Sequence, residues 1–327
     1  MSLPDFQVLR PRTVTEAVEL LGRYAGEVQV IAGGTDLIPS LRQRLFAPKY
    51  VLDISRIPEL RGIRPERDCL VIGAGTSLNA IEHSDVIRRD YPVLAAAAAT
   101  VASPLLRNMG TLGGNVCLNT RCIWYNQSLT WRKTCNFCIK KDGDLCHVAP
   151  SSSKCWAAFS ADTPPALLCL GAELDIVSPG GARRIAIRDF YTNLGDPPMK
   201  LGKDELLTCI SLPGASAGYH GSYRKLRVRG SIDYPLAGTA VAVKYSDGKV
   251  ADVRLAITAV NPAPFLVRGA EELLAGKALT EDLASAAGEL AARTAKPLTT
   301  SALTPEYRRE MVRVLTKRAL LDQASAQ

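Results

Sequence analysis

The sequence is poor in aromatic residues, in histidine and in long apolar runs. Phe, Trp and Tyr make up 6% of its 327 residues, and no run approaches the ~20 apolar residues that a membrane-spanning helix needs. The three histidines, His83, His147 and His220, are accompanied by no G-x-S-x-G or H-E-x-x-H pattern, so no hydrolase site is indicated. We therefore expect no membrane association and no catalytic side chain of the chain's own.

Charge and composition argue against two further classes. The net charge is +8, but Lys and Arg occur in scattered pairs such as Arg88-Arg89, not in one basic tract with interleaved aromatics, so no nucleic-acid partner is expected. The N-terminus lacks the basic start and apolar run of a secretory signal, and a 47% hydrophobic chain can form a core without disulfides. We expect a cytoplasmic protein whose thiols are reduced or metal-bound.

Local patterns predict an α+β protein with a domain boundary near residue 215. Thr13 and Glu16 form a capping box for a helix over 13–25, and a strand at 28–32 leads through a glycine turn into a helix over 37–45. Beyond residue 215, strands precede helices. The further predicted elements are strands at 50–54, 69–73, 221–228, 237–245 and 250–259, and helices at 93–101, 166–170, 265–275, 281–294 and 304–322.

Two glycine-rich turns could hold a phosphate-bearing cofactor. The segments 32–36 (Ala-Gly-Gly-Thr-Asp) and 110–115 (Gly-Thr-Leu-Gly-Gly-Asn) both offer backbone N–H groups with little side-chain obstruction, as a diphosphate site requires. Each could also be a plain tight turn, but two in one domain favour a dinucleotide. Asp162 stands before a proline-started helix, where it would cap the helix or accept from cofactor hydroxyls.

Six of the nine cysteines lie between residues 117 and 155. No helical or strand period persists over 119–159, and an irregular run of that length needs something other than a core to hold it. Two metal sites fit, and ordinary free thiols are the third possibility, favoured for Cys69, Cys169 and Cys209 in apolar runs. A zinc site would draw on Cys135, Cys138, Cys146, His147 and Cys155, whereas an iron–sulfur cluster would better tolerate the irregular gaps among Cys122, Cys138, Cys146 and Cys155.

The segments 30–37, 106–115 and 161–167 resemble the FAD-binding medium subunit of the xanthine oxidase and carbon monoxide dehydrogenase family of molybdenum hydroxylases. The resemblance covers nearly the whole chain. It implies a two-part FAD-binding domain of the vanillyl-alcohol-oxidase and xanthine-oxidase medium-subunit type over 1–215. A smaller C-terminal α+β domain, with an antiparallel sheet and helices, would occupy 216–327. In that family the second and third segments are almost contiguous, so residues 121–159 are an insertion.

The resemblance also implies two cofactors and their contacts. The insertion would hold a [4Fe–4S] cluster on Cys122, Cys138, Cys146 and Cys155, with Cys117 a bystander and Cys135 a fifth candidate. Asp162 would lie near the ribose of FAD, Val101 and Leu207 would line the cofactor, and Arg224 or Lys225 would lie at the isoalloxazine edge. The diphosphate would contact Val30, Ile31, Ala32, Gly33, Gly34, Thr35, Asp36, Leu37, Thr111, Gly113, Gly114 and Asn115.

The implied function is electron transfer within a larger enzyme. Electrons from a ferredoxin-type donor would pass from the cluster to FAD, then to a [2Fe–2S] small subunit and a molybdenum-cofactor large subunit, in a dimer of heterotrimers. An acidic donor could dock on the basic residues of the insertion, namely Arg121, Arg132, Lys133, Lys140, Lys141 and Lys154. Two alternatives remain: a hydroxylase flavoprotein subunit with structural zinc, and a basic zinc-bearing nucleic-acid-binding protein.

Overall fold

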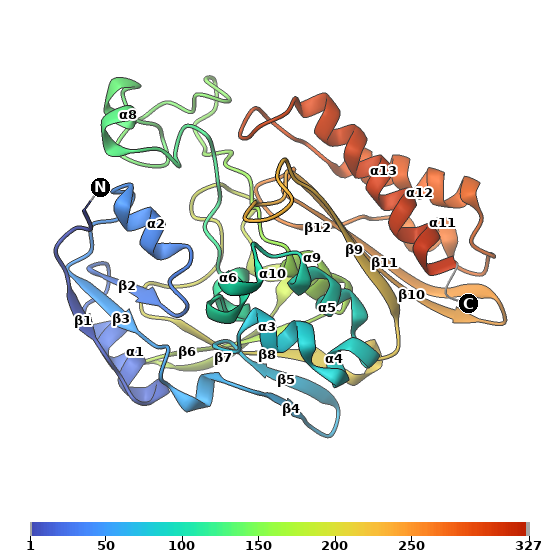
Figure 1. Cartoon of the computed structure of the whole chain (residues 1–327), viewed down its shortest axis with the longest axis horizontal. Helices are drawn as coiled ribbons and strands as arrows, with labels where there is room; N and C mark the ends of the chain where they lie inside the picture. Colours follow the sequence, from blue (N-terminus) through green and yellow to red (C-terminus); the bar gives the residue numbers. More distant parts are fainter. Residues whose placement is uncertain (1, 325–327) are drawn as a thin grey trace.

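The computed structural model describes residues 2–324 and shows an α+β chain built on three sheets (Figure 1). The predicted fold class is therefore confirmed. No helix in the described range is both long and apolar enough to cross a lipid bilayer.

The N-terminal sheet is parallel, with strand order β1-β3-β2. The Thr13 hydroxyl accepts from the Glu16 N–H at 3.1 Å, as the capping box predicts, and the helix that follows buries Ala17, Val18 and Leu21. The second helix ends at Arg42, short of the predicted residue 45, and Arg44 has a left-handed φ of 58° that a helix cannot continue through. The bounds are β1 (Gln7–Leu9), α1 (Val14–Arg23), β2 (Val28–Ile31), α2 (Leu37–Arg42) and β3 (Tyr50–Asp53).

The central sheet is antiparallel, with strand order β4-β5-β8-β6-β7. The largest hydrophobic cluster of the described residues joins this sheet to short helices that cover it. Its strands are β4 (Ile63–Pro65), β5 (Cys69–Gly73), β6 (Glu173–Ser178), β7 (Gly181–Ala186) and β8 (Leu206–Pro213). The α-helices of this part are α3 (Leu78–His83), α4 (Asp85–Asp90), α5 (Pro92–Ala99), α6 (Pro104–Met109), α7 (Leu112–Val116), α9 (Thr163–Cys169) and α10 (Ile187–Phe190), and the 3-10 turns are Pro58–Leu60 and Gly214–Ser216.

The third sheet, β12-β11-β10-β9, is antiparallel and has a packed layer on each face. Along its central strand, Ala240 and Ala242 face the core of the central sheet, whereas Val241 and Val243 face the C-terminal helices. Residues 265–266 form a strand, so the predicted helix at 265–275 is wrong at its start. The bounds are β9 (His220–Leu226), β10 (Ala237–Ser246), β11 (Lys249–Thr258), β12 (Phe265–Leu266), α11 (Ala270–Leu274), α12 (Glu281–Thr294) and α13 (Pro305–Ala324).

The insertion stands beside α2 and contains a single short helix, α8 (Leu129–Thr134) (Figure 1). That helix corrects the expectation of a run without regular structure. Arg132, 1% exposed, donates from Nη2 to the carbonyls of Gln43 and Arg44 at 3.3 and 2.8 Å. Arg132 therefore holds the insertion against the C-terminal end of α2, because hydrogen bonds from a charged guanidinium to backbone carbonyls are strong.

Candidate functional site

The first glycine turn presents a row of free backbone donors. It connects β2 to α2, and the N–H groups of Gly33, Gly34, Thr35 and Asp36 have no acceptor among residues 2–324. Gly34 has a φ of 71°, which glycine adopts without strain. Consecutive free N–H groups form an anion-binding concavity, so this turn can hold a diphosphate.

The two glycine turns touch each other directly. A Cβ on Gly33 would lie 1.9 Å from the Met109 carbonyl oxygen, and a Cβ on Gly110 would lie 3.5 Å from Thr35 Oγ1. Only glycine at position 33 permits this approach. The structure therefore brings together two segments that lie far apart in the sequence.

The second turn differs from the first in its hydrogen bonding. Residues 112–116 form α7, and Thr111 caps it by accepting from the Gly114 N–H at 3.1 Å. The Gly113 N–H donates to the Ala74 carbonyl at 2.8 Å, and the Asn115 N–H donates to the Thr111 carbonyl at 3.0 Å. In this segment the N–H groups of residues 110 and 112–115 are used within the described part of the fold and that of Thr111 is not, so the first turn supplies most of the open donors.

Asp162 is part of a buried charge network. Its Oδ1 accepts from the Tyr223 hydroxyl at 2.8 Å, and its Oδ2 accepts from Lys225 Nζ at 2.9 Å. Burial raises the pKa of the Asp162 carboxyl, and the Lys225 ammonium and the Tyr223 hydroxyl oppose that rise. Lys225 also donates to the Thr100 carbonyl at 3.1 Å.

The predicted role of Asp162 as a helix cap is wrong, because its side chain accepts no first-turn amide of α9. Asn115, which is distant in the sequence, caps the start of α9 instead. Its Oδ1 accepts from the Thr163 N–H at 3.0 Å and from the Thr163 hydroxyl at 2.6 Å. The side chain of the second glycine segment thereby fixes the start of the helix that follows Asp162.

The structure separates the two basic candidates on β9. Arg224 pairs with Asp322 of α13 at 2.6 Å, whereas Lys225 lies with Asp162, because successive side chains of a strand point to opposite faces. Only Lys225 therefore shares a site with another predicted residue. Leu207, in β8, is 4% exposed and belongs to the core of the central sheet.

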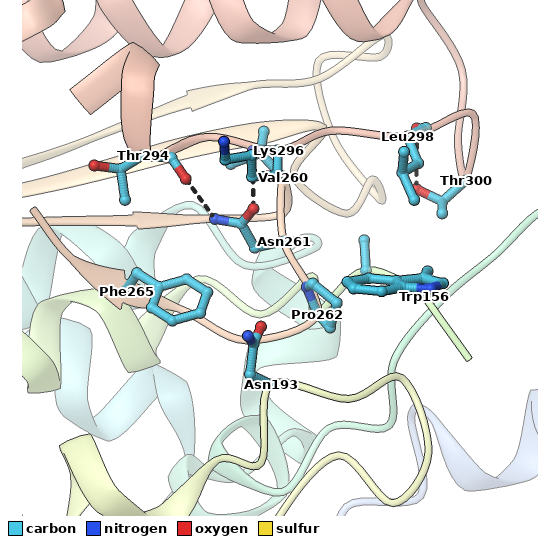
Figure 2. Close-up of a pocket in the computed structure, with 11 residues that line it drawn as sticks. Trp156, Asn193, Val260, Asn261, Pro262, Phe265, Thr294, Lys296, Leu298 and Thr300 are labelled. Atoms are coloured by element: carbon cyan, nitrogen blue, oxygen red, sulfur yellow. Dashed lines mark hydrogen bonds between the residues drawn. The ribbon is translucent and has the colours of Figure 1, made fainter. Parts of the chain in front are cut away.

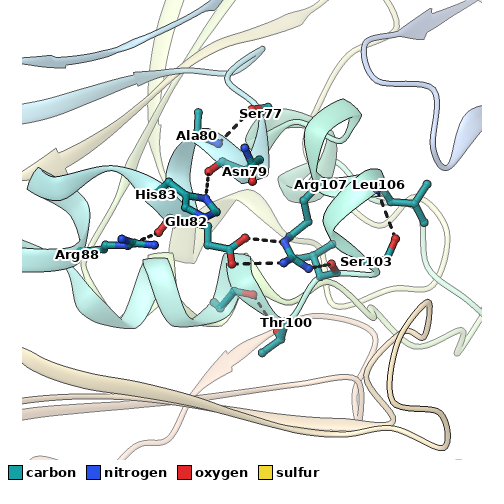
Figure 3. Close-up of polar contacts among 12 residues, drawn as sticks. Ser77, Asn79, Ala80, Glu82, His83, Arg88, Thr100, Ser103, Leu106 and Arg107 are labelled. Carbon is teal, nitrogen blue, oxygen red and sulfur yellow. Dashed lines mark hydrogen bonds and ion pairs between the residues drawn. The ribbon is translucent and has the colours of Figure 1, made fainter.

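A second, partly buried ion pair, Glu82–Arg107 (Figure 3), supports the turn that contains Val101. Arg107 of α6 pairs with Glu82 of α3 at 2.7 Å and donates to the Val101 carbonyl at 3.1 Å. The next residue, Ala102, has a φ of 46°. The pair therefore holds α6, and the second glycine segment after it, against α3.

Two contacts around Asp36 were not predicted. Tyr234, in the loop between β9 and β10, donates its hydroxyl to Asp36 Oδ1 at 3.0 Å. The Arg121 guanidinium forms an ion pair with Asp36 and lies 3.8 Å from the centre of the Tyr234 ring. Burial lowers the pKa of Arg121. No local pattern marks Tyr234, since its partner is distant in sequence.

Four thiols of the insertion line one small cavity. Cys122, Cys138, Cys146 and Cys155 are all buried and share it with Trp124, Tyr125, Lys140 and His147. These are the four predicted cluster ligands. Cys117 and Cys135 do not line the cavity and are partly exposed, and burial raises the pKa of the Cys122 thiol to about 12.

The four thiols line one cavity without forming a tight metal-ligand group. Within residues 2–324, no group of three or more His, Cys, Asp or Glu side chains converges closely enough to hold a metal ion. His147 is also occupied, because its Nε2 lies 2.5 Å from the Phe137 carbonyl oxygen and its ring stacks on Trp124.

The predicted donor-docking residues divide into two groups. Arg121, Arg132 and Lys140 point inward, to Asp36, to the end of α2 and to the thiol cavity, which corrects their assignment to a docking surface. The residues left at the surface are Lys133, Lys141 and Lys154.

A second cavity lies elsewhere. It has a volume of about 170 Å³ and lies where the end of the insertion meets the C-terminal part of the chain (Figure 2). The Asn261 amide there donates to the Thr294 carbonyl at 3.2 Å and accepts from the Lys296 N–H at 2.8 Å. None of the predicted cofactor residues lines this cavity.

Comparison with known proteins identifies the class to which this site belongs. Residues 4–215 match the family model described as the FAD binding domain in molybdopterin dehydrogenase, and residues 221–323 match the CO dehydrogenase flavoprotein C-terminal domain. The chain therefore belongs to the FAD-binding medium subunits of the molybdenum hydroxylase family. It is an FAD-binding subunit of an oxidoreductase, and this membership removes the nucleic-acid alternative.

Individual relatives are similar in sequence to this chain over nearly its full length. The chain is 31% identical to the carbon monoxide dehydrogenase medium chain of Hydrogenophaga pseudoflava, over 97% of this chain and 96% of that one. It is 26% identical to the xanthine dehydrogenase FAD-binding subunit of Escherichia coli O157:H7, over 97% and 95% of the two chains. The solved structure of the Hydrogenophaga pseudoflava enzyme matches with a TM-score of 0.81 at 30% identity, over 100% of this chain and 99% of that one. The two-domain fold implied by the sequence is confirmed.

Proposed function

We propose that this chain is the β subunit of a 4-hydroxybenzoyl-CoA reductase, a member of the family in which the insertion at 121–159 holds a [4Fe–4S] cluster. The observation that carries the proposal is that Cys122, Cys138, Cys146 and Cys155 all line one cavity. The domain boundary near residue 215 belongs to the same proposal.

The residues around the cavity fit such a cluster. Four cysteine thiols are its usual ligands, and the described residues that line the cavity include no Asp or Glu. When bound, the cluster would supply one-electron transfer. The protein contributes four sulfur atoms and a largely apolar wall formed by Trp124, Tyr125, Ile139 and Val148.

The proposed flavin site rests on contacts within the chain. The free N–H groups of the first turn would bind the diphosphate. The second glycine segment packs against the first turn through Met109 and Gly110. Lys225 places a cation beside Asp162, and a cation near the isoalloxazine edge would favour the reduced, anionic flavin.

The proposed partners are a molybdenum-cofactor large subunit and a [2Fe–2S] small subunit in a dimer of heterotrimers. The large subunit would remove the phenolic hydroxyl of 4-hydroxybenzoyl-CoA to give benzoyl-CoA, with electrons from a ferredoxin. For the donor, the insertion offers exposed Trp131 and Leu145 beside the surface lysines. A donor rate that is insensitive to ionic strength would contradict charge-guided docking.

The experiment is an anaerobic assay of the purified holoenzyme with reduced ferredoxin and 4-hydroxybenzoyl-CoA. We expect benzoyl-CoA to form, and the rate to fall when Cys155→Ser is introduced, with Cys135→Ser as the matched control that keeps the rate. Zinc in place of iron, together with substrate hydroxylation, would instead support an ordinary hydroxylase subunit.

A further inference from the structure

Lys140 places a positive charge at the wall of the thiol cavity. It follows Cys138 by two residues, and its side chain lines the same cavity as the four cysteines. Its ammonium group donates to Asn119 Oδ1 at 2.9 Å, to Thr120 Oγ1 at 2.7 Å and to the Gly195 carbonyl. An ammonium has three N–H donors, so all of them are used by oxygen atoms of the chain.

No carboxylate forms a direct ion pair with this charge, and the Asp196 carboxylate acts on it from a longer distance. Among residues 2–324, no Asp or Glu oxygen lies within 4.0 Å of the Lys140 ammonium. Its neighbour Lys141 is the residue that pairs with Asp142, at 3.1 Å, and Asp144 is exposed on the outside of the loop. A charge withdrawn from water needs a counter-charge nearby. Asp196 supplies part of it from outside the cavity, and Cys155, which lines the cavity, acts on Lys140 more strongly than Asp196 does.

The contacts of Lys140 also fix it relative to the thiols. Asn119 and Thr120 lie just before Cys122 in the sequence, and the Gly195 N–H donates to the Cys155 carbonyl at 2.9 Å. A Cβ on Gly195 would lie 2.6 Å from Cys155 Sγ. The lysine is therefore held at a constant distance from the segments that carry Cys122, Cys138 and Cys155.

We propose that Lys140 is the fixed counter-charge of the cluster held by these four cysteines, and that it raises the reduction potential of that cluster. The inference rests on the proposed function. The net charge around an iron–sulfur cluster is one of the factors that set its potential, and a neighbouring cation favours the form that carries one more electron. Because its donors are all used, Lys140 acts by charge and position rather than by a hydrogen bond to sulfur.

The test is an EPR-monitored redox titration of the anaerobic holoenzyme, with iron, sulfide and FAD measured on the same samples. Lys140→Met removes the charge at similar length, Lys140→Arg keeps it, and Lys141→Met is the neighbouring control. We expect Lys140→Met to keep its iron and to show an equilibrium constant for one-electron reduction about tenfold to a hundredfold lower. Lys140→Arg and Lys141→Met should remain close to wild type.

Each of the other possible outcomes supports or overturns either the inference or the proposed function. An iron-loaded Lys140→Met with an unchanged potential overturns the inference and leaves the proposed function intact, whereas wild-type protein without iron overturns the proposed function itself. If Lys140→Met fails to assemble the cluster and Lys140→Arg assembles it with the wild-type potential, the requirement for charge is supported. If neither variant retains iron, Lys140 has only an architectural role and the inference is wrong.

Discussion

Lys225 Nζ lies 2.9 Å from Asp162 Oδ2, and the two side chains are only 3% and 4% exposed. The pair joins β9 to the residue that precedes α9, so it connects the third sheet with the segment next to the glycine turns. A buried pair of this kind is costly to break, because removal of one partner leaves the other charged and unsolvated.

Removal of the lysine should therefore destabilise the fold. We expect Lys225→Met to lower the free energy of unfolding by about 3–5 kcal/mol, measured by urea denaturation of the purified chain. Tyr223→Phe is the control, since it removes one hydrogen bond to the same carboxylate and should cost about 1 kcal/mol. Equal stabilities of Lys225→Met and wild type would show that the pair is not needed.

The cost of Lys225→Met should depend on pH. Burial already raises the pKa of the Asp162 carboxyl, and removal of the opposing ammonium raises it further. A carboxyl whose pKa is higher in the folded state than its unfolded value of about 3.9 disfavours folding increasingly as pH rises between the two values. The stability deficit should be smaller at pH 5 than at pH 8, and a deficit independent of pH would contradict this origin.

The contact between the two glycine turns predicts loss of cofactor from Gly33→Ala. The added methyl would collide with the Met109 carbonyl, which is backbone and cannot swing away. We expect the FAD content after gel filtration to fall at least about tenfold. The added methyl would force the two glycine turns apart, and the proposed FAD site depends on their contact. Gly230→Ala is the control, since nothing lies within 4 Å of its Cβ position, and it should retain FAD fully.

The Glu82–Arg107 pair predicts a milder loss (Figure 3). Arg107→Met leaves Glu82 without its partner and frees the Val101 carbonyl, so the turn at 100–103 should loosen. We expect a destabilisation of about 1–3 kcal/mol and a several-fold weaker affinity for FAD, measured by fluorescence titration of the deflavinated protein. Arg88→Met should change neither, since exposed Arg88 contacts only the Glu82 backbone carbonyl. Wild-type affinity in Arg107→Met would show that the turn does not support the cofactor.

Elements that depend on local patterns were predicted well. The strand Cys69–Gly73 and the helix Glu281–Thr294 have the bounds that the sequence indicated, because apolar periodicity and turn residues mark both ends. The strands β6, β7 and β8 over residues 173–213 were not predicted, although they form much of the central sheet. The sequence predicts a helix at Phe265–Leu266 where the structure has a strand, because two residues carry no period and only pairing with β11 defines them.

The candidate site was predictable in its residue types but not in its contacts. Glycine spacing located both turns, yet the meeting of Gly33 with Met109 links positions that no local pattern connects. Asp162 was expected to cap its own helix, a role that Asn115 performs from outside the segment. The sequence predicts Lys140 to be one of several surface charges, and only the fold shows that it lines the thiol cavity.

The metal content of anaerobically purified holoenzyme tests the central claim most directly. The cavity lined by Cys122, Cys138, Cys146 and Cys155 predicts about four iron atoms and four sulfides per FAD from this chain, in addition to those of the proposed [2Fe–2S] subunit. Cys155→Ser should lose that iron, and Cys135→Ser should keep it. One zinc per FAD, or full iron in Cys155→Ser, would contradict the account.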